Sequence, residues 1–299
     1  MRKGEVKMTQ HLDQMAVEDL LTAMNNQDKS VPLAVENALT QIKPVIDACV
    51  EAIRNGGKVI YMGSGTSGRL GVLDASECPP TFGVSPDVFK GIIAGGDHAI
   101  RFAVENAEDN QFQGAIDVEN ILTDKDVLIG IAASGRTPYV IGGIEKAKEL
   151  GVFTAGIVCK PDTKIAEIVD GPIELLVGEE IVRGSTRLKA GTAQKLVLNM
   201  ISTITMIKLG KVYEDYMVDV RASNHKLRKR TIGIICEIAE VSEDTAKEAL
   251  QACDNRLKAA VLVSKFNISS EEAFEILTDY EDNLRESITY LETKSAVLG

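Results

Sequence analysis

Apolar residues recur at helical spacing in the first fifth of the chain. One stripe runs from Val17 to Met24 and a second from Leu39 to Ile53, with Pro32 between them. Each stripe repeats every three or four residues, as one face of a helix does. Gly56-Gly57 follows the second stripe, and glycine commonly ends a helix. The pattern predicts an N-terminal helical segment over residues 1–57 that packs on the domain after it.

Between residues 58 and about 180, short apolar runs alternate with helical segments. The runs predict strands near 58–62, 88–94, 126–133, 153–159 and 173–177, and the segments between them predict helices near 66–76, 97–107, 137–149 and 162–168. This alternation is typical of the α/β class, in which helices cover both faces of a doubly wound parallel sheet. Ligands bind to such sheets at the carboxyl ends of the strands.

The rest of the chain is predicted to be helical. A long helix is expected over 188–209, and its apolar stripe, which includes Ala193, Val197 and Ile201, is typical of a core or a dimer seam. From about residue 230 only short helices are predicted, and Ser269 with Glu272 forms a capping box for one of them. We therefore expect an α/β domain over 58–229 and a small all-helical module over 230–299 with a stabilising or docking role.

Two loops rich in glycine and hydroxyl residues follow predicted strands. The first loop is Gly63-Ser-Gly-Thr-Ser-Gly68, and the second loop is Ala132-Ala-Ser-Gly-Arg-Thr137. Glycine lets backbone N–H groups approach an anion closely, and the helix after each loop directs its positive N-terminal end at that anion. Serine and threonine hydroxyls donate further hydrogen bonds. The two loops together predict a site for a phosphorylated small molecule.

Two other interpretations of these loops remain open. Gly63, Gly65 and Gly68 also fit the dinucleotide pattern G-x-G-x-x-G, which expects an acidic residue about 20 residues further on. The second predicted strand ends in Ala94-Gly95-Gly96 instead, which argues against a dinucleotide. The loops could also be ordinary strand-to-helix turns, because glycine, serine and threonine are common turn and capping residues.

Composition and charge narrow the classes of partner. The 299 residues are 44% hydrophobic and 26% charged, as in an ordinary globular enzyme, and the net charge is −11. That charge repels nucleic acid and anionic membrane surfaces, so neither is expected as a partner. Five cysteines without a C-x-x-C pair and an N-terminus without an apolar signal core predict a cytoplasmic protein. Three scattered histidines lack ligand spacing, so no metal and no cofactor is expected.

Acidic residues lie close to the loops in the sequence. Glu77 precedes Pro79-Pro80, which we expect to end a helix beside the first loop, while Glu105 and Glu108 close the predicted helix after the second strand. Carboxylates near a phosphate site are electrostatically costly, which favours a role in acid or base catalysis. A single glutamate is nevertheless more often a solvated surface residue. Cys78 has no histidine near it in the sequence to activate it, so a buried thiol is expected there.

A third polar segment precedes the long predicted helix. Ser185, Thr186, Arg187 and Lys189 place two hydroxyls and two cations at the helix start. Capping explains the hydroxyls and a solvated face explains the cations. Contact with an anionic ligand explains both, and the sequence leaves these alternatives open.

Four segments together resemble the N-acetylmuramic acid 6-phosphate etherases, which are sugar isomerase (SIS) domain enzymes. The segments are Gly63–Leu70, Asp74-Ala-Ser-Glu-Cys-Pro-Pro-Thr-Phe-Gly83, Ala132–Tyr139 and Gly184–Ala193. The resemblance runs from about Leu12 to the end, and the helical residues after 230 resemble that family's ubiquitin-associated-like module. It implies a SIS-type sheet, a sugar phosphate substrate and a homodimer.

The resemblance also implies a reaction, in which a carbon–oxygen lyase splits the D-lactyl ether of its substrate. In the open-chain sugar a base removes the hydrogen on carbon 2, lactate leaves from carbon 3 with the help of an acid, and water adds. Glu77 corresponds to the proton donor and Glu108 to the partner acid or base, with Glu105 the rival for the second role. Unequal environments can keep one carboxyl protonated and the other ionised.

The remaining implied contacts hold the substrate. His225 and Arg183 fall outside the family motifs and receive no role. The substrate-binding residues implied by the resemblance are Ser64, Gly65, Thr66, Ser67, Ser134, Gly135, Arg136 and Thr137, with Ser185, Thr186 and Lys189 as weaker candidates.

Two other functions use the same features. An aldose–ketose phosphate isomerase would remove the same carbon-2 proton and expel nothing. A sugar-phosphate sensor similar to glucokinase regulatory protein would bind the ligand without using the carboxylates in a reaction. Carboxylates beside a phosphate site favour a catalytic role instead.

Overall fold

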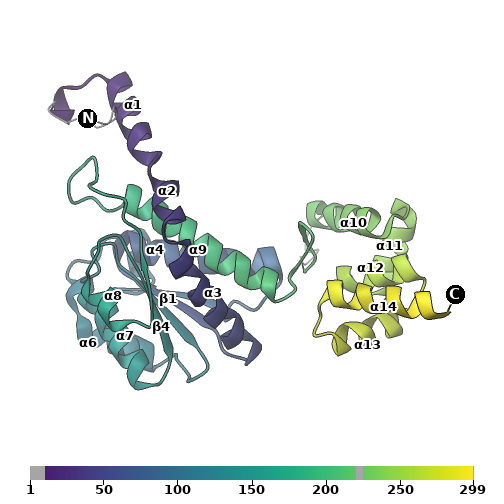
Figure 1. Cartoon of the computed structure of the whole chain (residues 1–299). Helices are drawn as coiled ribbons and strands as arrows, with labels where there is room; N and C mark the ends of the chain where they lie inside the picture. The colour runs from purple at the N-terminus through teal and green to yellow at the C-terminus, as the bar shows by residue number, and fades with distance from the viewer. Residues whose placement is uncertain (1–10, 220–224, 299) are drawn as a thin grey trace.

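The computed structural model describes residues 11–219 and 225–298, and its centre is a five-stranded parallel sheet (Figure 1). The strand order is β2-β1-β3-β4-β5. The strands are β1 (Val59–Gly63), β2 (Phe89–Ile93), β3 (Val127–Ile131), β4 (Phe153–Val158) and β5 (Gly171–Glu174). The predicted sheet is thus confirmed, because strands covered on both faces show themselves as continuous apolar runs. Residues 1–10, 220–224 and 299 lie outside the described residues, and Ser223 and Asn224, which precede His225, are among them.

The register of the sheet brings the two loops together. Gly63, the last residue of β1, pairs with Ile131, the last residue of β3, and both strands are completely buried. The first loop and the second loop therefore leave the same edge of the sheet at adjacent strands. A site at this edge draws on residues almost 70 positions apart in sequence.

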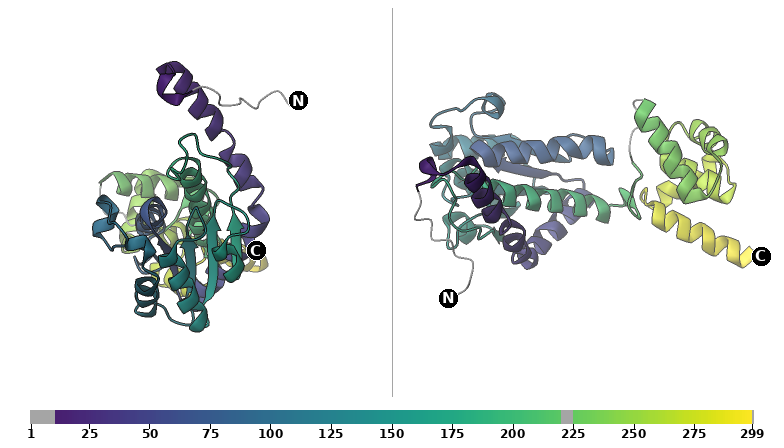
Figure 2. Two further views of the ribbon diagram at one scale, coloured as in Figure 1. Left: turned by 90° about the vertical axis from the view of Figure 1, so that its left-hand side faces the viewer. Right: turned by 90° about the horizontal axis from the view of Figure 1, so that it is seen from above.

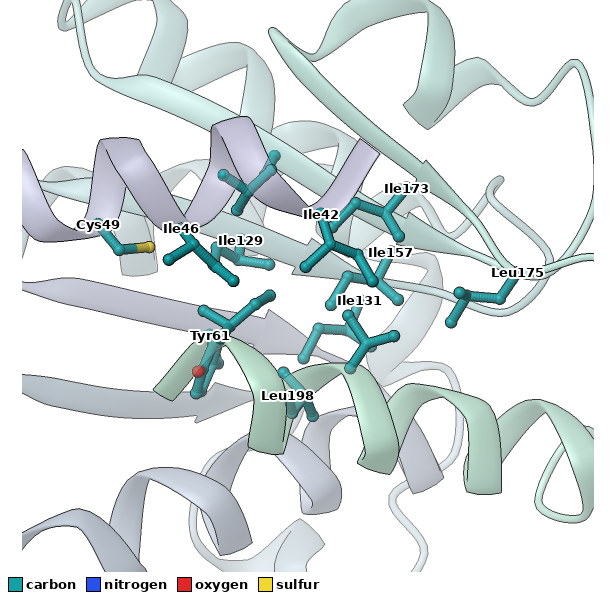
Figure 3. Packing of buried hydrophobic residues seen from close by; sticks show 14 of the residues in the cluster. Ile42, Ile46, Cys49, Tyr61, Ile129, Ile131, Ile157, Ile173, Leu175 and Leu198 are labelled. Carbon is teal, nitrogen blue, oxygen red and sulfur yellow. The ribbon is translucent and has the colours of Figure 1, made fainter. Parts of the chain in front are cut away.

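Helices cover both faces of the sheet. On one face lie α3 (Leu39–Arg54), α4 (Gly65–Phe82) and α9 (Lys189–Lys208), whose apolar residues share a core with Tyr61, Ile129 and Ile131 (Figure 3). On the other face, α6 (Gln111–Glu119), α7 (Pro138–Glu149) and α8 (Lys164–Ile168) form a second core with Ile60 and Leu128. Alternate strand residues thus point to opposite cores, as the pleat requires.

The helix α4 lies directly against the sheet because glycines remove side chains from the contact. A Cβ atom at Gly91 would lie 2.5 Å from Cα of Val72, and one at Gly71 would lie 2.9 Å from Cβ of Tyr61. Bulkier residues would push the helix away from β1 and β2. These contacts hold α4 close to the sheet at Gly71 and Val72.

Two expectations about the helices are wrong. Pro79 and Pro80 do not end α4, which continues to Phe82 and stops at Gly83 in the left-handed conformation (φ 67°). Proline fixes a φ value that is itself helical, so near a helix end it removes hydrogen bonds without reversing the chain. The helix predicted near 97–107 is only the single turn α5 (His98–Arg101), and α6 was not predicted, because Gly114 at its centre weakens the helical pattern.

The N-terminal helices differ in how far they pack on the sheet. α3 and α2 (Val31–Glu36) contact α9, whereas α1 (Val17–Asp28) has no buried residue and projects from the domain (Figure 1). The stripe of Val17 and Leu21 is therefore exposed. By contrast, the stripe of α9 through Ala193, Val197 and Ile201 is fully buried in this chain's own core. These three residues therefore belong to the core, whereas Ile204 of the same helix is 37% exposed, and the dimer seam considered for the helix stays a prediction.

The C-terminal residues form a separate helical core (Figure 2). A short hairpin, β6 (Val212–Tyr213) and β7 (Tyr216–Met217), lies between α9 and this module. The helices of the module are α10 (His225–Ala239), α11 (Glu243–Ala252), α12 (Leu257–Phe266), α13 (Ser270–Asp279) and α14 (Leu284–Leu298). Ser269 caps α13 by accepting a hydrogen bond from the backbone N–H of Glu272 (3.1 Å), so the predicted N-terminus is confirmed.

A buried ammonium group ties the module to the residues that leave the α/β domain. Nζ of Lys258, on α12, lies 2.6 Å from a carboxylate oxygen of Asp219 and 3.0 Å from one of Asp282. Lys258 is only 2% exposed. A charge so deeply buried is tolerated only when it is paired, so these contacts hold α12 against the segment that enters the module. None of the helices within 11–219 and 225–298 combines the length and apolar character that crossing a membrane requires.

Candidate active site

The first loop forms the start of an 18-residue helix. Gly65 adopts a left-handed conformation (φ 51°), and α4 begins there with Ser64 as its N-cap, whose side chain does not cap the helix. A Cβ atom at Gly68 would lie 2.6 Å from the Ile93 side chain and 2.8 Å from the carbonyl oxygen of Gly63. The glycines thus serve packing as well as backbone conformation. The N–H groups of the first turn and the helix dipole together favour an anion at this point.

The hydroxyls of the first loop point in different directions. Ser67 is buried and donates a hydrogen bond to the side-chain oxygen of Gln194 on α9 (2.9 Å), so it joins the loop to the helix layer. Thr66 is half-buried beside Gly191 of α9, where a Cβ atom would lie 3.4 Å from its methyl group. Ser64 donates a hydrogen bond to Glu108. Among the three, Ser64 and Thr66 retain access to a ligand.

The second loop is a tight turn held by glycine. Gly135 has φ 63°, and a Cβ atom there would lie 2.3 Å from Cβ of Thr163. The hydroxyl of Ser134 accepts a hydrogen bond from the backbone N–H of Arg136 (3.3 Å), and both of these side chains are exposed. Thr137 is the N-cap of α7. This loop adds a second helix N-terminus, a hydroxyl and a guanidinium group beside the first loop.

Glu108 lies at the first loop although 44 residues separate it from Ser64. It belongs to the short 3-10 helix η2 (Ala107–Asp109), and its carboxylate accepts the hydrogen bond from Oγ of Ser64 (3.3 Å). Arg69, on the second turn of α4, donates to the carbonyl oxygen of Ile100 (2.9 Å) and holds the segment that leads to η2. A carboxylate is thus held beside the first loop, within reach of a ligand bound there.

Glu77 does not lie near this carboxylate in the same chain. It is exposed on α4, twelve residues after Gly65, which corresponds to about 18 Å at the helical rise of about 1.5 Å per residue. The expectation that Glu77 sits beside the first loop is therefore wrong for a single chain. A helix over 66–76 already carries Glu77 to the end opposite the first loop, so the expectation overlooked the helical rise.

The third polar segment is arranged differently from the expectation. α9 begins at Lys189, and Ser185 and Thr186 lie in the turns before it rather than capping it. The carboxylate of Glu180 caps the helix instead, because it accepts hydrogen bonds from the backbone N–H groups of Lys189 (3.0 Å) and Ala190 (2.9 Å). Nζ of Lys189 points to Gln27 on α1 (2.6 Å). Glu180 gives no local signal in the sequence, since capping rules consider only the residues next to a helix.

Cys78 is buried against α9, as expected. It is 2% exposed, and burial raises the pKa of its thiol to about 12. A thiol with such a pKa is protonated at neutral pH and is a poor nucleophile. Within residues 11–219 and 225–298, no three histidine, cysteine, aspartate or glutamate side chains lie together as ligands of a metal ion would.

Cys78→Ala is expected to leave kcat within about twofold of the unsubstituted chain, because a protonated, buried thiol does not attack the substrate. A thiol-specific reagent should modify the half-exposed Cys236 before Cys78. Steady-state rates and mass spectrometry of the modified peptides test both statements. A large loss of kcat in a Cys78→Ala protein that retains its thermal stability would contradict them.

Two known proteins or domains share the fold of the α/β part of the chain. The model of the glucokinase regulatory protein N-terminal SIS domain matches residues 41–148, which include both loops and Glu108. A phosphoheptose isomerase from Francisella tularensis shares the fold, with a TM-score of 0.53 and 21% identity over 64% of this chain and 100% of that one.

Curated relatives match almost the whole chain. N-acetylmuramic acid 6-phosphate etherases from Histophilus somni (strain 129Pt) and Staphylococcus aureus (strain USA300) are each 50% identical to it. The first alignment covers 93% of this chain and 92% of the relative, and the second covers 94% of each. Alignments over 93% and 94% of the chain span both loops and most of the helical module. The chain belongs to the N-acetylmuramic acid 6-phosphate etherase family.

Proposed function

We propose that the chain cleaves the D-lactyl ether of N-acetylmuramic acid 6-phosphate and releases N-acetylglucosamine 6-phosphate and D-lactate. The observation that carries this proposal is the carboxylate of Glu108, which lies in hydrogen-bond contact with an anion-binding loop. The curated etherases, 50% identical over nine-tenths of the chain, support the same reaction. The activity is that of a carbon–oxygen lyase.

The two loops hold the phosphate on carbon 6. The first turns of α4 and α7 direct backbone N–H groups at the phosphate, and the hydroxyls of Ser64, Thr66, Ser134 and Thr137 donate to its oxygens. Arg136 adds positive charge, which the overall charge of −11 does not supply. Ser67 contributes indirectly, because its hydrogen bond to Gln194 holds the loop against α9.

Glu108 and Glu77 supply the proton transfers. Glu108, as the carboxylate, removes the hydrogen from carbon 2 of the open-chain sugar, where the aldehyde stabilises the developing charge. The bond between carbon 3 and the ether oxygen breaks, and Glu77 protonates that oxygen as lactate leaves. Water then adds to carbon 3 of the unsaturated aldehyde and carbon 2 regains a proton. Each step uses one carboxyl group in the protonation state that the previous step requires.

The test is the release of D-lactate from N-acetylmuramic acid 6-phosphate, measured with a D-lactate dehydrogenase. In water enriched in ¹⁸O, elimination and hydration place the label on carbon 3 of the sugar product, whereas hydrolysis at the lactyl carbon places it in lactate. An isomerase on the same fold would form a ketose phosphate and no lactate. A sensor would bind the sugar phosphate without turnover, and either result would contradict the proposal.

We also propose the compartment and the oligomeric state in which the protein acts. The cysteines within the described residues are all free thiols, which fits the reducing cytoplasm. There the protein acts as a homodimer that recycles an amino sugar of the cell wall, and its products return to carbohydrate metabolism.

A further inference from the structure

Gln194, on α9, is a completely buried amide that contacts the first loop. The residue is 0% exposed, and an amide buried without hydrogen-bond partners is costly. Its side-chain oxygen accepts a hydrogen bond from Oγ of Ser67 (2.9 Å), which lies in the first turn of α4. One polar atom of Gln194 is thus committed to the first loop.

The amide nitrogen of Gln194 leads to the second loop. Nε2 donates to Sγ of Cys159 (3.9 Å), the residue that directly follows β4. Burial raises the pKa of this thiol to about 12, so the sulfur is neutral where it accepts the hydrogen bond. The backbone N–H of Cys159 in turn donates to the carbonyl oxygen of Ala133 in the second loop (3.0 Å). Contacts through Cys159 therefore join Gln194 to the second loop.

The start of α9 gives Gln194 a fixed base. Gly191, three residues earlier, lies on the same face of the helix, and a Cβ atom there would lie 3.4 Å from the methyl group of Thr66. The carboxylate of Glu180 accepts hydrogen bonds from the first two backbone N–H groups of α9, so this turn is itself held in place. A side chain that extends from such a turn holds its partners at a defined distance.

Strand pairing alone does not set the distance between the two loops. Gly63 pairs with Ile131 at the ends of β1 and β3, and both loops continue beyond this last pair. Ser67 and Ala133 belong to the parts of the loops that lie past the sheet. The amide of Gln194 connects these parts from the side of α9.

We propose that Gln194 is a positioning residue that sets the separation of the two loops, so that both bind the same phosphate group. Being fully buried, it acts on the ligand through Ser67 and Cys159 rather than by contact. The inference rests on the proposed function, in which the loops hold the phosphate on carbon 6. Because the reaction leaves that phosphate unchanged, its contacts stabilise the bound substrate and the transition state alike. Weakening them should therefore raise KM and leave kcat nearly unchanged.

Gln194→Met tests this role, because methionine has a similar length and volume but lacks the amide donor and acceptor. The Kd of N-acetylglucosamine 6-phosphate, measured by calorimetry, is expected to rise about tenfold, since a buried hydroxyl loses its partner and the loops lose their link. The KM of N-acetylmuramic acid 6-phosphate should rise by about the same factor, with kcat within about threefold of the unsubstituted chain. Thermal unfolding shows that each protein is folded at the temperature of the assay.

Asn199→Leu is the matched control on the same helix. Nδ2 of Asn199 donates to a carboxylate oxygen of Asp74 on α4 (2.7 Å), so this variant also loses a hydrogen bond between α9 and α4. Asp74 lies about 14 Å along the helix axis from Gly65, away from the loop. The thermal midpoint should fall, while the Kd of N-acetylglucosamine 6-phosphate should stay within about twofold of the unsubstituted value.

Ser67→Ala and Cys159→Ala each remove one of the two links. Ser67→Ala should raise the Kd in the unsubstituted chain and have a smaller effect in the Gln194→Met protein, where the same hydrogen bond is already lost. Cys159→Ala should raise the Kd by about threefold, since sulfur is a weak acceptor. These two variants carry the test if Gln194→Met does not fold.

The outcomes separate the inference from the proposed function. An unchanged Kd in folded Gln194→Met, an equal rise in Asn199→Leu, or additive effects of Ser67→Ala and Gln194→Met overturns the inference and leaves the proposed function standing. Unchanged Kd values in Ser67→Ala and Cys159→Ala overturn it as well. An unsubstituted protein that does not bind N-acetylglucosamine 6-phosphate contradicts the proposed function, and the inference falls with it.

Discussion

Glu108→Gln is expected to reduce kcat for D-lactate release by about 10³-fold, because an amide cannot remove the proton from carbon 2 and positioned acid–base groups contribute about 10²–10⁴-fold. The substitution keeps the shape of the side chain and its capacity to accept the hydrogen bond from Ser64. Folding and phosphate binding should therefore be unchanged. The loss should fall on kcat, with little change in KM.

The measurement compares three proteins. The unsubstituted chain, Glu108→Gln and Glu105→Gln are assayed for lactate, and their affinity for N-acetylglucosamine 6-phosphate is measured by calorimetry. Glu105 is the matched control, since it is an exposed glutamate three residues earlier in the same segment. If Glu105→Gln lost activity and Glu108→Gln kept it, the base would be Glu105 and the assignment of Glu108 would be wrong.

Gly114→Ala is expected to lower the free energy of unfolding by about 3 kcal/mol, because overpacking a close backbone contact costs about that much. A Cβ atom at Gly114 would lie 1.9 Å from the carbonyl oxygen of Tyr139, so α6 and α7 would have to separate. Since α6 directly follows η2, the same shift would displace Glu108 from the first loop. The rate of D-lactate release should therefore fall together with the free energy of unfolding.

Gly233→Ala is the control, because it makes the same substitution in a helix where nothing lies within 4 Å of the new atom. Alanine has the higher helix propensity, so this variant should be more stable by up to about 1 kcal/mol. Denaturant unfolding of both variants gives the two differences. If Gly114→Ala and Gly233→Ala changed the free energy of unfolding in the same direction, the close contact between α6 and α7 would not limit stability.

The sequence predicts the sheet better than the helices. Continuous apolar runs mark β1 and β3 to within two residues, and the loops after them are recognisable from their glycines and hydroxyls. α6 was missed because a glycine that looks like a break is required where Tyr139 approaches. α4 was predicted too short because Pro79 and Pro80 resemble a helix end, although their fixed φ value suits a final turn.

The sequence predicts which kinds of residue form the candidate site, but it does not predict how they are arranged in space. The phosphate loops are local features, and strand order places them together. Glu108 reaches the first loop through a contact 44 residues away in sequence, and the cap of α9 by Glu180 spans nine residues. The position of Glu77 depends on the length and direction of a helix. Such distances follow from tertiary packing, which a pattern of residue types does not contain.

The cap supplied by Glu180 has a consequence for the choice of substrate. Its carboxylate occupies the backbone N–H groups at the start of α9, next to the turn that carries Ser185 and Thr186. An incoming lactyl carboxylate would meet a like charge at that helix end and find its donors already taken. The start of α9 therefore does not supply the donors that would distinguish an acid-bearing ether from a neutral alkyl ether.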